Sequence, residues 1–153
     1  MAVLVYLFGG FFSWEASSLL LYDRAQFASR TGLIFVSFDC KVGVLGFPNS
    51  SSSEAPGNMG LYDQGEALRW IHENIRIFGG DPTAITLAGE SAGPVSVSYH
   101  LMTKLSEKLF KRSVLMSGTP FTIEFTEGLG HHETFRRVGE VFNCFDFYAP
   151  WEW

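Results

Sequence analysis

The chain has 153 residues, of which 46% are hydrophobic and 16% aromatic, so it can form one modest domain with a dry core and does not resemble a disordered polypeptide. Its 16 acidic and 11 basic residues give a net charge of -5, and no basic cluster exceeds the pairs Lys111-Arg112 and Arg136-Arg137, which argues against nucleic acid and anionic membrane surfaces as partners. Every apolar run is far shorter than the ~20 residues of a membrane-spanning helix, so we expect no such helix.

The first predicted element is a strand from Ala2 to Phe8, because this run is apolar and partly β-branched. The residues from Met1 to Phe8 include neither the basic residues nor the small-residue cleavage site of a signal peptide, so we expect the chain to begin inside a fold. The glycine pair Gly9-Gly10 directly follows this strand. A second strand is predicted from Leu33 to Phe38.

The clearest helix is predicted from Leu61 to Phe78, where apolar residues recur on one face and Gly79-Gly80 ends the pattern. Two further strands are predicted, from Ile85 to Ala88 and from Ser113 to Met116. Apolar strands that alternate with helices indicate the α/β class, with a parallel sheet buried on both faces. The chain contains no internal repeat and no linker, so we expect residues 1–153 to belong to one domain.

A G-x-S-x-G motif, Gly89-Glu90-Ser91-Ala92-Gly93, lies between the third predicted strand and a helix that begins at about Ala92. This context is typical of a nucleophile elbow, a sharp turn that exposes a serine hydroxyl beside the N-terminus of a helix. Unpaired N–H groups and the helix dipole favour an anion at that point, which suits the oxyanion of acyl transfer. The alternative is that Ser91 is only the N-cap of the helix in a glycine-rich turn.

An acyl-transfer site also needs hydrogen-bond donors where negative charge develops on the carbonyl oxygen. The backbone N–H groups of Gly9 and Gly10 can turn into such a site beside the N–H of Ala92. The alternative interpretation is that the glycine pair forms only a turn. Its place after the first strand, with an elbow after the third, favours the oxyanion hole.

Several segments of the chain resemble the successive signature blocks of the type-B carboxylesterase and cholinesterase family, in the same order and spacing. They are VLVYLFGGFF, FVSFDCKVGVLGF, APGNMGLYDQGEALRWIHENIRIFGGDP, ITLAGESAG and LMSG. The resemblance covers the chain from about Val3 to Gly118 and then weakens. It implies a partial α/β-hydrolase fold, a mostly parallel sheet flanked by helices, and hydrolysis of carboxylic esters by a triad of serine, glutamate and histidine.

The resemblance also implies roles for individual residues. Ser91 matches the catalytic nucleophile, Ala92 the oxyanion donor that follows it, and Gly9 and Gly10 the glycine loop. Glu90 matches an acidic residue that lines the choline site in cholinesterases. The implied partner is a small-molecule carboxylic ester, with no metal and no other cofactor.

Two departures from the family pattern bear on this site. Only two glycines follow Phe8 where the family usually has three small residues, so the oxyanion donors are either Gly9 and Gly10 or Gly10 and Phe11. We prefer the first pair, because Phe11 carries a Cβ atom. The family's usual Asn-Tyr-Arg is replaced by Asp39-Cys40-Lys41, which removes a large aromatic ring and a bidentate guanidinium, and we expect looser packing there.

The triad partners of such a serine follow it in chain order, first the acid and then the histidine. After Ser91 the histidines are His100, which the following helix directs away from Ser91, and the pair His131 and His132, expected on the solvated face of an amphipathic helix. We therefore interpret the chain as an amino-proximal fragment of a serine esterase, truncated at both ends and inactive by itself. Two alternatives are a neuroligin-like interaction protein on the same fold, which the presence of Ser91 disfavours, and a truncated product without catalytic function.

The two cysteines and one glycosylation sequence bear on the cellular compartment. Cys40 and Cys144 lack the CxxC spacing of a metal or redox pair. Cys144 resembles a family cysteine whose disulfide partner lies downstream, beyond Trp153. Asn49 begins an Asn-Ser-Ser glycosylation sequence in a serine-rich stretch that is typical of a surface loop. With the resemblance, this sequence predicts a secreted protein or one on the extracellular surface.

Overall fold

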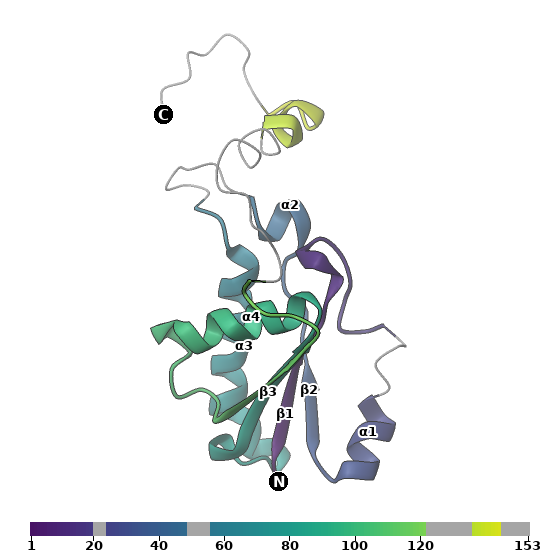
Figure 1. Cartoon of the computed structure of the whole chain (residues 1–153), viewed down its shortest axis with the longest axis vertical. Helices are drawn as coiled ribbons and strands as arrows, with labels where there is room; N and C mark the ends of the chain where they lie inside the picture. The colour runs from purple at the N-terminus through teal and green to yellow at the C-terminus, as the bar shows by residue number, and fades with distance from the viewer. Residues whose placement is uncertain (20–23, 49–55, 122–135, 145–153) are drawn as a thin grey trace.

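The computed structural model of the chain describes residues 1–19, 24–48, 56–121 and 136–144. Its centre is a sheet of four strands in the spatial order β2-β1-β3-β4 (Figure 1). Each neighbouring pair of strands is parallel, which confirms the predicted strands and the α/β class. The strands are β1 (Val3–Leu7), β2 (Ile34–Ser37), β3 (Ile85–Glu90) and β4 (Arg112–Met116).

The predicted long helix over residues 61–78 is present as an α-helix that tightens into a 3-10 turn at its end. It begins at Met59, and Gly79, with φ 81°, ends it in the left-handed conformation that glycine adopts without penalty. The helix after the third strand begins at Ala92, as predicted. The helices around the sheet are α1 (Arg24–Thr31), α2 (Gly43–Gly46), α3 (Met59–Asn74) and α4 (Ala92–Met102), and the 3-10 turns are Gly10–Phe12, Ile75–Phe78, Pro82–Ala84 and Lys104–Ser106. Residues 136–141, near the end of the described chain, are helical as well.

One face of the sheet is buried against α3 and α4 (Figure 1). Side chains alternate along a strand, so β1 directs Val3, Val5 and Leu7 to this face. Full burial of each such side chain contributes roughly 1.5–3 kcal/mol to the stability of the fold. This packed layer therefore supports the loops at the strand ends. The other members of this core come from β3, α3 with the 3-10 turn that follows it, and α4, and are Ile85, Leu87, Leu68, Ile71, Ile75 and Val97.

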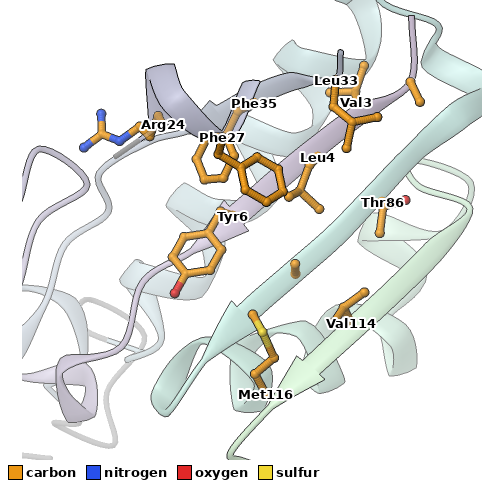
Figure 2. Close-up of a pocket in the computed structure, with 12 residues that line it drawn as sticks. Val3, Leu4, Tyr6, Arg24, Phe27, Leu33, Phe35, Thr86, Val114 and Met116 are labelled. Carbon is orange, nitrogen blue, oxygen red and sulfur yellow. The ribbon is translucent and has the colours of Figure 1, made fainter. Parts of the chain in front are cut away.

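The sequence predicted a sheet buried on both faces, but the described residues cover the opposite face only in part. Near β2 it packs against α1, where the rings of Phe27 and Phe35 lie 5.6 Å apart (Figure 2). Toward β4 it opens into a hollow of about 510 Å³. Val114 and Met116 of β4 line this hollow and are 44% and 40% exposed.

The handedness of the crossovers explains which helix lies on which face. From β1 the chain moves to β2 at one edge of the sheet, but from β2 it crosses in the opposite direction to β3 and then to β4. Because such crossovers are right-handed, α1 lies on one face, and α3 and α4 lie on the other. The neighbouring strands β1 and β3 are thus followed by helices on opposite faces. A crevice suited to a ligand is expected at the carboxyl ends of these two strands.

Candidate active site

Ser91 lies in the turn between β3 and α4, at the carboxyl end of the sheet. Its backbone has φ 58° and ψ -109°, a conformation that is rare for a residue with a Cβ atom and costs about 1–3 kcal/mol. Its side chain makes no capping hydrogen bond to α4, so the interpretation of Ser91 as an ordinary N-cap is not supported. A strained turn from strand to helix is the geometry in which a serine hydroxyl is presented to a substrate.

The two glycines of the motif allow this turn to be tight. A Cβ atom on Gly89 would lie 2.5 Å from the carbonyl carbon of Gly93. A Cβ atom on Gly93 would lie 2.3 Å from the carbonyl oxygen of Leu7. Neither position has room for a side chain, so the spacing of the motif is a packing requirement that brings the start of α4 against the end of β1.

The loop after β1 contacts the serine. A Cβ atom on Gly9 would lie 3.0 Å from the Cβ atom of Ser91, so the two backbones are close neighbours. Gly10 (φ 75°) and Phe11 (φ 55°) then turn in the left-handed conformation, and the carbonyl of Gly10 accepts a hydrogen bond from the N–H of Ser13 at 2.9 Å. The glycine loop and the turn at Ser91 therefore meet at the crevice expected between β1 and β3.

Glu90 and Ala92 flank the serine on either side of the turn. Glu90 is exposed, and its Oε2 atom would be 3.3 Å from a Cβ atom on Gly9. Ala92 is buried as the first residue of α4, where backbone N–H groups have no partner within the helix. The structure thus brings Gly9, Glu90, Ser91 and Ala92 together at the N-terminus of α4, the end of a helix whose dipole favours negative charge.

His100 lies in α4 behind the serine and is engaged elsewhere. It is 4% exposed, its Nδ1 atom is 2.7 Å from the hydroxyl of Ser106, and its Nε2 atom is 3.1 Å from Oε1 of Gln64. Both ring nitrogens are therefore occupied by groups other than Ser91. This geometry agrees with the expectation that the helix directs His100 away from Ser91.

The partners of His100 belong to a buried polar network that no sequence motif revealed. Gln64 of α3 donates from Nε2 to the hydroxyl of Ser96 at 3.3 Å and to the sulfur of Cys40 at 3.5 Å. Its amide therefore links α3 to α4. A weak signal exists in the sequence, because Gln64 is a polar residue on the same apolar face of the helix as Leu68.

This network predicts a pH-dependent stability, because burial lowers the pKa of His100 from 6.5 to about 4. A histidine whose pKa is lower in the folded state stabilises the fold fully above pH 6.5, and this contribution falls as the pH drops toward 4. We expect the free energy of unfolding to decrease by on the order of 3 kcal/mol over this interval, from this group alone.

Urea unfolding at several pH values measures this effect in the full-length product. This term denotes the longest protein encoded by the gene that contains these residues. The variant His100→Gln cannot titrate and serves as the control. We expect it to remove this part of the pH dependence. The same slope in the variant and the parent protein would contradict the assignment to His100.

Asn49, His131 and His132 lie outside the described residues. His72 contacts the carbonyl oxygen of Leu109 through Nδ1 at 3.2 Å, and both cysteines carry free thiols. In the part of the chain that the structure describes, no three histidine, cysteine or acidic side chains gather to hold a metal ion, and none of the helices has the length and apolar character needed to cross a membrane.

Comparison with known proteins places this sequence in a family. The sequence model of the carboxylesterase family matches residues 1–151. The chain belongs to the carboxylesterase family. It is 43% identical over 162 residues to an acetylcholinesterase from Myxine glutinosa, an alignment that covers 98% of this chain and 48% of the relative.

Two other relatives support the assignment to the carboxylesterase family. A cholinesterase 2 from Branchiostoma lanceolatum is 44% identical over 117 residues, which cover 76% of this chain and 35% of the relative. An acetylcholinesterase from Danio rerio is 46% identical over 123 residues, which cover 80% of this chain and 19% of the relative. The chain thus spans about half, or less, of the length of the curated relatives that it matches.

At the segment where this chain departs from the pattern of the carboxylesterase family, Lys41 pairs with Asp63 of α3. Its Nζ atom lies 2.8 and 3.0 Å from the two carboxylate oxygens, and its backbone N–H donates to the same carboxylate at 2.9 Å. Desolvation opposes the effect, but these hydrogen bonds lower the pKa of Asp63. The lysine therefore contacts both oxygens of its partner and connects this segment to α3 without a guanidinium group.

Proposed function

We propose that this chain is the nucleophile-bearing part of a larger α/β-hydrolase domain, and that the full-length product hydrolyses carboxylic esters through an acyl-enzyme on Ser91. The observation that supports this proposal is the strained turn that places Ser91 between Gly9 and the N-terminus of α4. The names of the relatives favour a small ester of the cholinesterase type as substrate. With the glycosylation sequence at Asn49, outside the described residues, they also favour a protein that acts outside the cell.

In the first half of the proposed reaction, Oγ of Ser91 attacks the carbonyl carbon of the ester. The serine proton passes to a general base, which the described part of the chain does not place beside Ser91. The carbonyl oxygen becomes negatively charged and accepts hydrogen bonds from the backbone N–H groups of Gly9, Gly10 and Ala92. When the C=O bond re-forms, the alcohol leaves with the proton from the base, and the acyl group remains on Ser91.

In the second half, a water molecule attacks the acyl carbon and gives its proton to the same base. The same N–H groups stabilise the second oxyanion. Its collapse releases the carboxylic acid and returns the proton to Ser91, so that the enzyme is regenerated. Glu90 lies beside the serine, where its carboxylate would favour a positively charged alcohol such as a choline group.

The proposal is tested by measuring hydrolysis of chromogenic acetyl and butyryl esters by the full-length product. We expect multiple turnovers per molecule, and a preference for cationic over neutral alcohols if Glu90 acts as proposed. A folded product that hydrolyses neither ester would contradict the enzymatic function and favour a neuroligin-like interaction protein instead.

The oxyanion hole can be tested at Gly9, because φ there is -86°, which lies near the range of proline, whereas φ 75° at Gly10 excludes proline. The ψ of -121° at Gly9 is unfavourable for alanine and proline alike, so this strain is common to both variants below. Gly9→Pro removes the N–H donor, and Gly9→Ala adds only a Cβ atom 3.0 Å from the Cβ atom of Ser91. We expect Gly9→Pro to have a kcat about 10²–10³ lower than that of Gly9→Ala, with a smaller change in KM.

Steady-state kinetics of the two variants and the parent protein provide this comparison. The alanine variant controls for crowding, since it retains the donor. Equal kcat values for the two variants would show that the Gly9 N–H is not a donor, and would favour the alternative pair Gly10 and Phe11.

A further inference from the structure

The last residue of β4 and the turn that follows it, residues 116–118, have no role in the reaction described above, although they form most of the last family-like segment of the sequence. Ser117 has φ 60°, a left-handed conformation that is unfavourable for a serine. It directs the chain back toward the end of β3, so that Gly118 lies against Ser91. Two serines with strained backbones therefore lie at the carboxyl ends of neighbouring strands.

The first contact between the two turns is a hydrogen bond. The N–H of Ser91 donates to the carbonyl oxygen of Met116 at 3.1 Å. Glu90 and Met116 are the last paired residues in the register of β3 and β4, so this bond extends the ladder one step into the nucleophile turn. The backbone of β4 thereby holds the amide side of Ser91.

The second contact is steric and lies on the carbonyl side of the serine. A Cβ atom on Gly118 would be 2.4 Å from the carbonyl oxygen of Ser91 and 2.9 Å from Cγ of Pro94. Gly118 is not in the left-handed region, so a glycine is required here for space and not for its backbone conformation. Any side chain at position 118 would displace the carbonyl of Ser91 or the first turn of α4.

We propose that residues 116–118 are a positioning element that holds Ser91 in its strained conformation from both its amide and its carbonyl side. A strained backbone persists only where the surrounding structure over-determines it, and the Ser91 side chain contributes no cap to α4. The restraint therefore comes from backbone contacts, of which Met116 and Gly118 supply one on each side. The catalytic consequence, a correctly aimed Ser91 hydroxyl, rests on the function proposed above, whereas the geometry is independent of it.

The test compares Gly118→Ala with Gly65→Ala in the full-length product. A Cβ atom on Gly65 in α3 would meet no atom within 4 Å, so this control adds the same methyl group without a clash. Two measurements are made on each protein. They are hydrogen exchange of the Ser91 amide and the rate at which a fluorophosphonate probe phosphonylates Ser91, a step that forms a P–O bond and expels fluoride.

For Gly118→Ala we expect faster exchange of the Ser91 amide and a maximal labelling rate about 10- to 100-fold lower, since small misplacements of a reacting group have effects of this size. The probe concentration that gives half the maximal rate should change little. Labelling rates are normalised to the folded fraction, so a variant that is only less stable would not show the decrease. Gly65→Ala should behave like the parent protein in both measurements.

Wild-type exchange and labelling in Gly118→Ala would overturn the proposal. If Gly118→Ala does not fold, hydrogen exchange of the Ser91 amide in the parent protein provides the test. Rapid exchange would show that Met116 does not hold this amide and would overturn the proposal. Slow exchange would support it. If the parent protein is not labelled at all, but Gly118→Ala frees the Ser91 amide, the positioning element stands and the proposed enzymatic function fails.

Discussion

Replacement of Ser91 by alanine is expected to lower kcat of the full-length product for ester hydrolysis by on the order of 10⁶, the loss seen when a catalytic serine is removed. The substitution takes away the only atom that can form the acyl-enzyme in the proposed reaction. The oxyanion donors are backbone groups and remain, so a residual acceleration of about 10³–10⁴ over the reaction in water should persist. KM should change much less than kcat, because the pocket keeps its shape.

The measurement combines steady-state kinetics with mass spectrometry after treatment with an organophosphate probe. Ser29→Ala provides a matched control, since Ser29 is exposed on α1 and its hydroxyl donates to the carbonyl of Gln26 at 3.0 Å. We expect the adduct on Ser91 in the parent protein and in the control, and none in Ser91→Ala. An adduct on another residue, with labelling undiminished in Ser91→Ala, would refute the assignment of the nucleophile.

The second large effect concerns the 153 residues expressed alone, which are expected to show no enzymatic ester hydrolysis. The serine hydroxyl stays protonated near neutral pH unless a base takes its proton. Neither described histidine serves, since both ring nitrogens of His100 are engaged by Ser106 and Gln64, and His72 contacts Leu109. The nucleophile is therefore present without its activating group, and turnover should not exceed what an oxyanion hole alone provides.

Poor folding of the isolated chain is expected for a related reason. In the described sheet β2 and β4 are the outer strands, and the face that carries Val114 and Met116 is open toward β4. Unpaired strand edges and exposed apolar surface favour association between chains. We therefore expect aggregates in size-exclusion chromatography and not a soluble monomer.

The test is to purify the isolated chain and to assay it with chromogenic acetyl and butyryl esters beside its Ser91→Ala variant. A soluble monomer with multiple turnovers that disappear in the variant would contradict both expectations. In that case His131 and His132, which lie outside the described residues, would become the first candidates for the base.

The local features of this protein follow from its sequence because they depend on short-range preferences. Apolar, β-branched runs specify the strands, and a pattern of apolar residues closed by Gly79 specifies α3 and its 3-10 extension to within two residues at its start. The G-x-S-x-G motif specifies the turn at Ser91, because close backbone approaches at Gly89 and Gly93 exclude any side chain there. In each case the residues that set the structure are a few positions apart.

Contacts between distant segments depend instead on how the elements pack. The handedness of the crossovers places α1 on one face and α3 and α4 on the other. Beside β4 the described residues leave the α1 face open, whereas the apolar strands suggested burial on both faces. The same topology brings Gly9 and Gly118 against Ser91 from two other strands. The link between Gln64 and His100 likewise forms only when α3 meets α4. No local pattern encodes such meetings, because they arise from the burial of one common core and not from the conformational preferences of neighbouring residues.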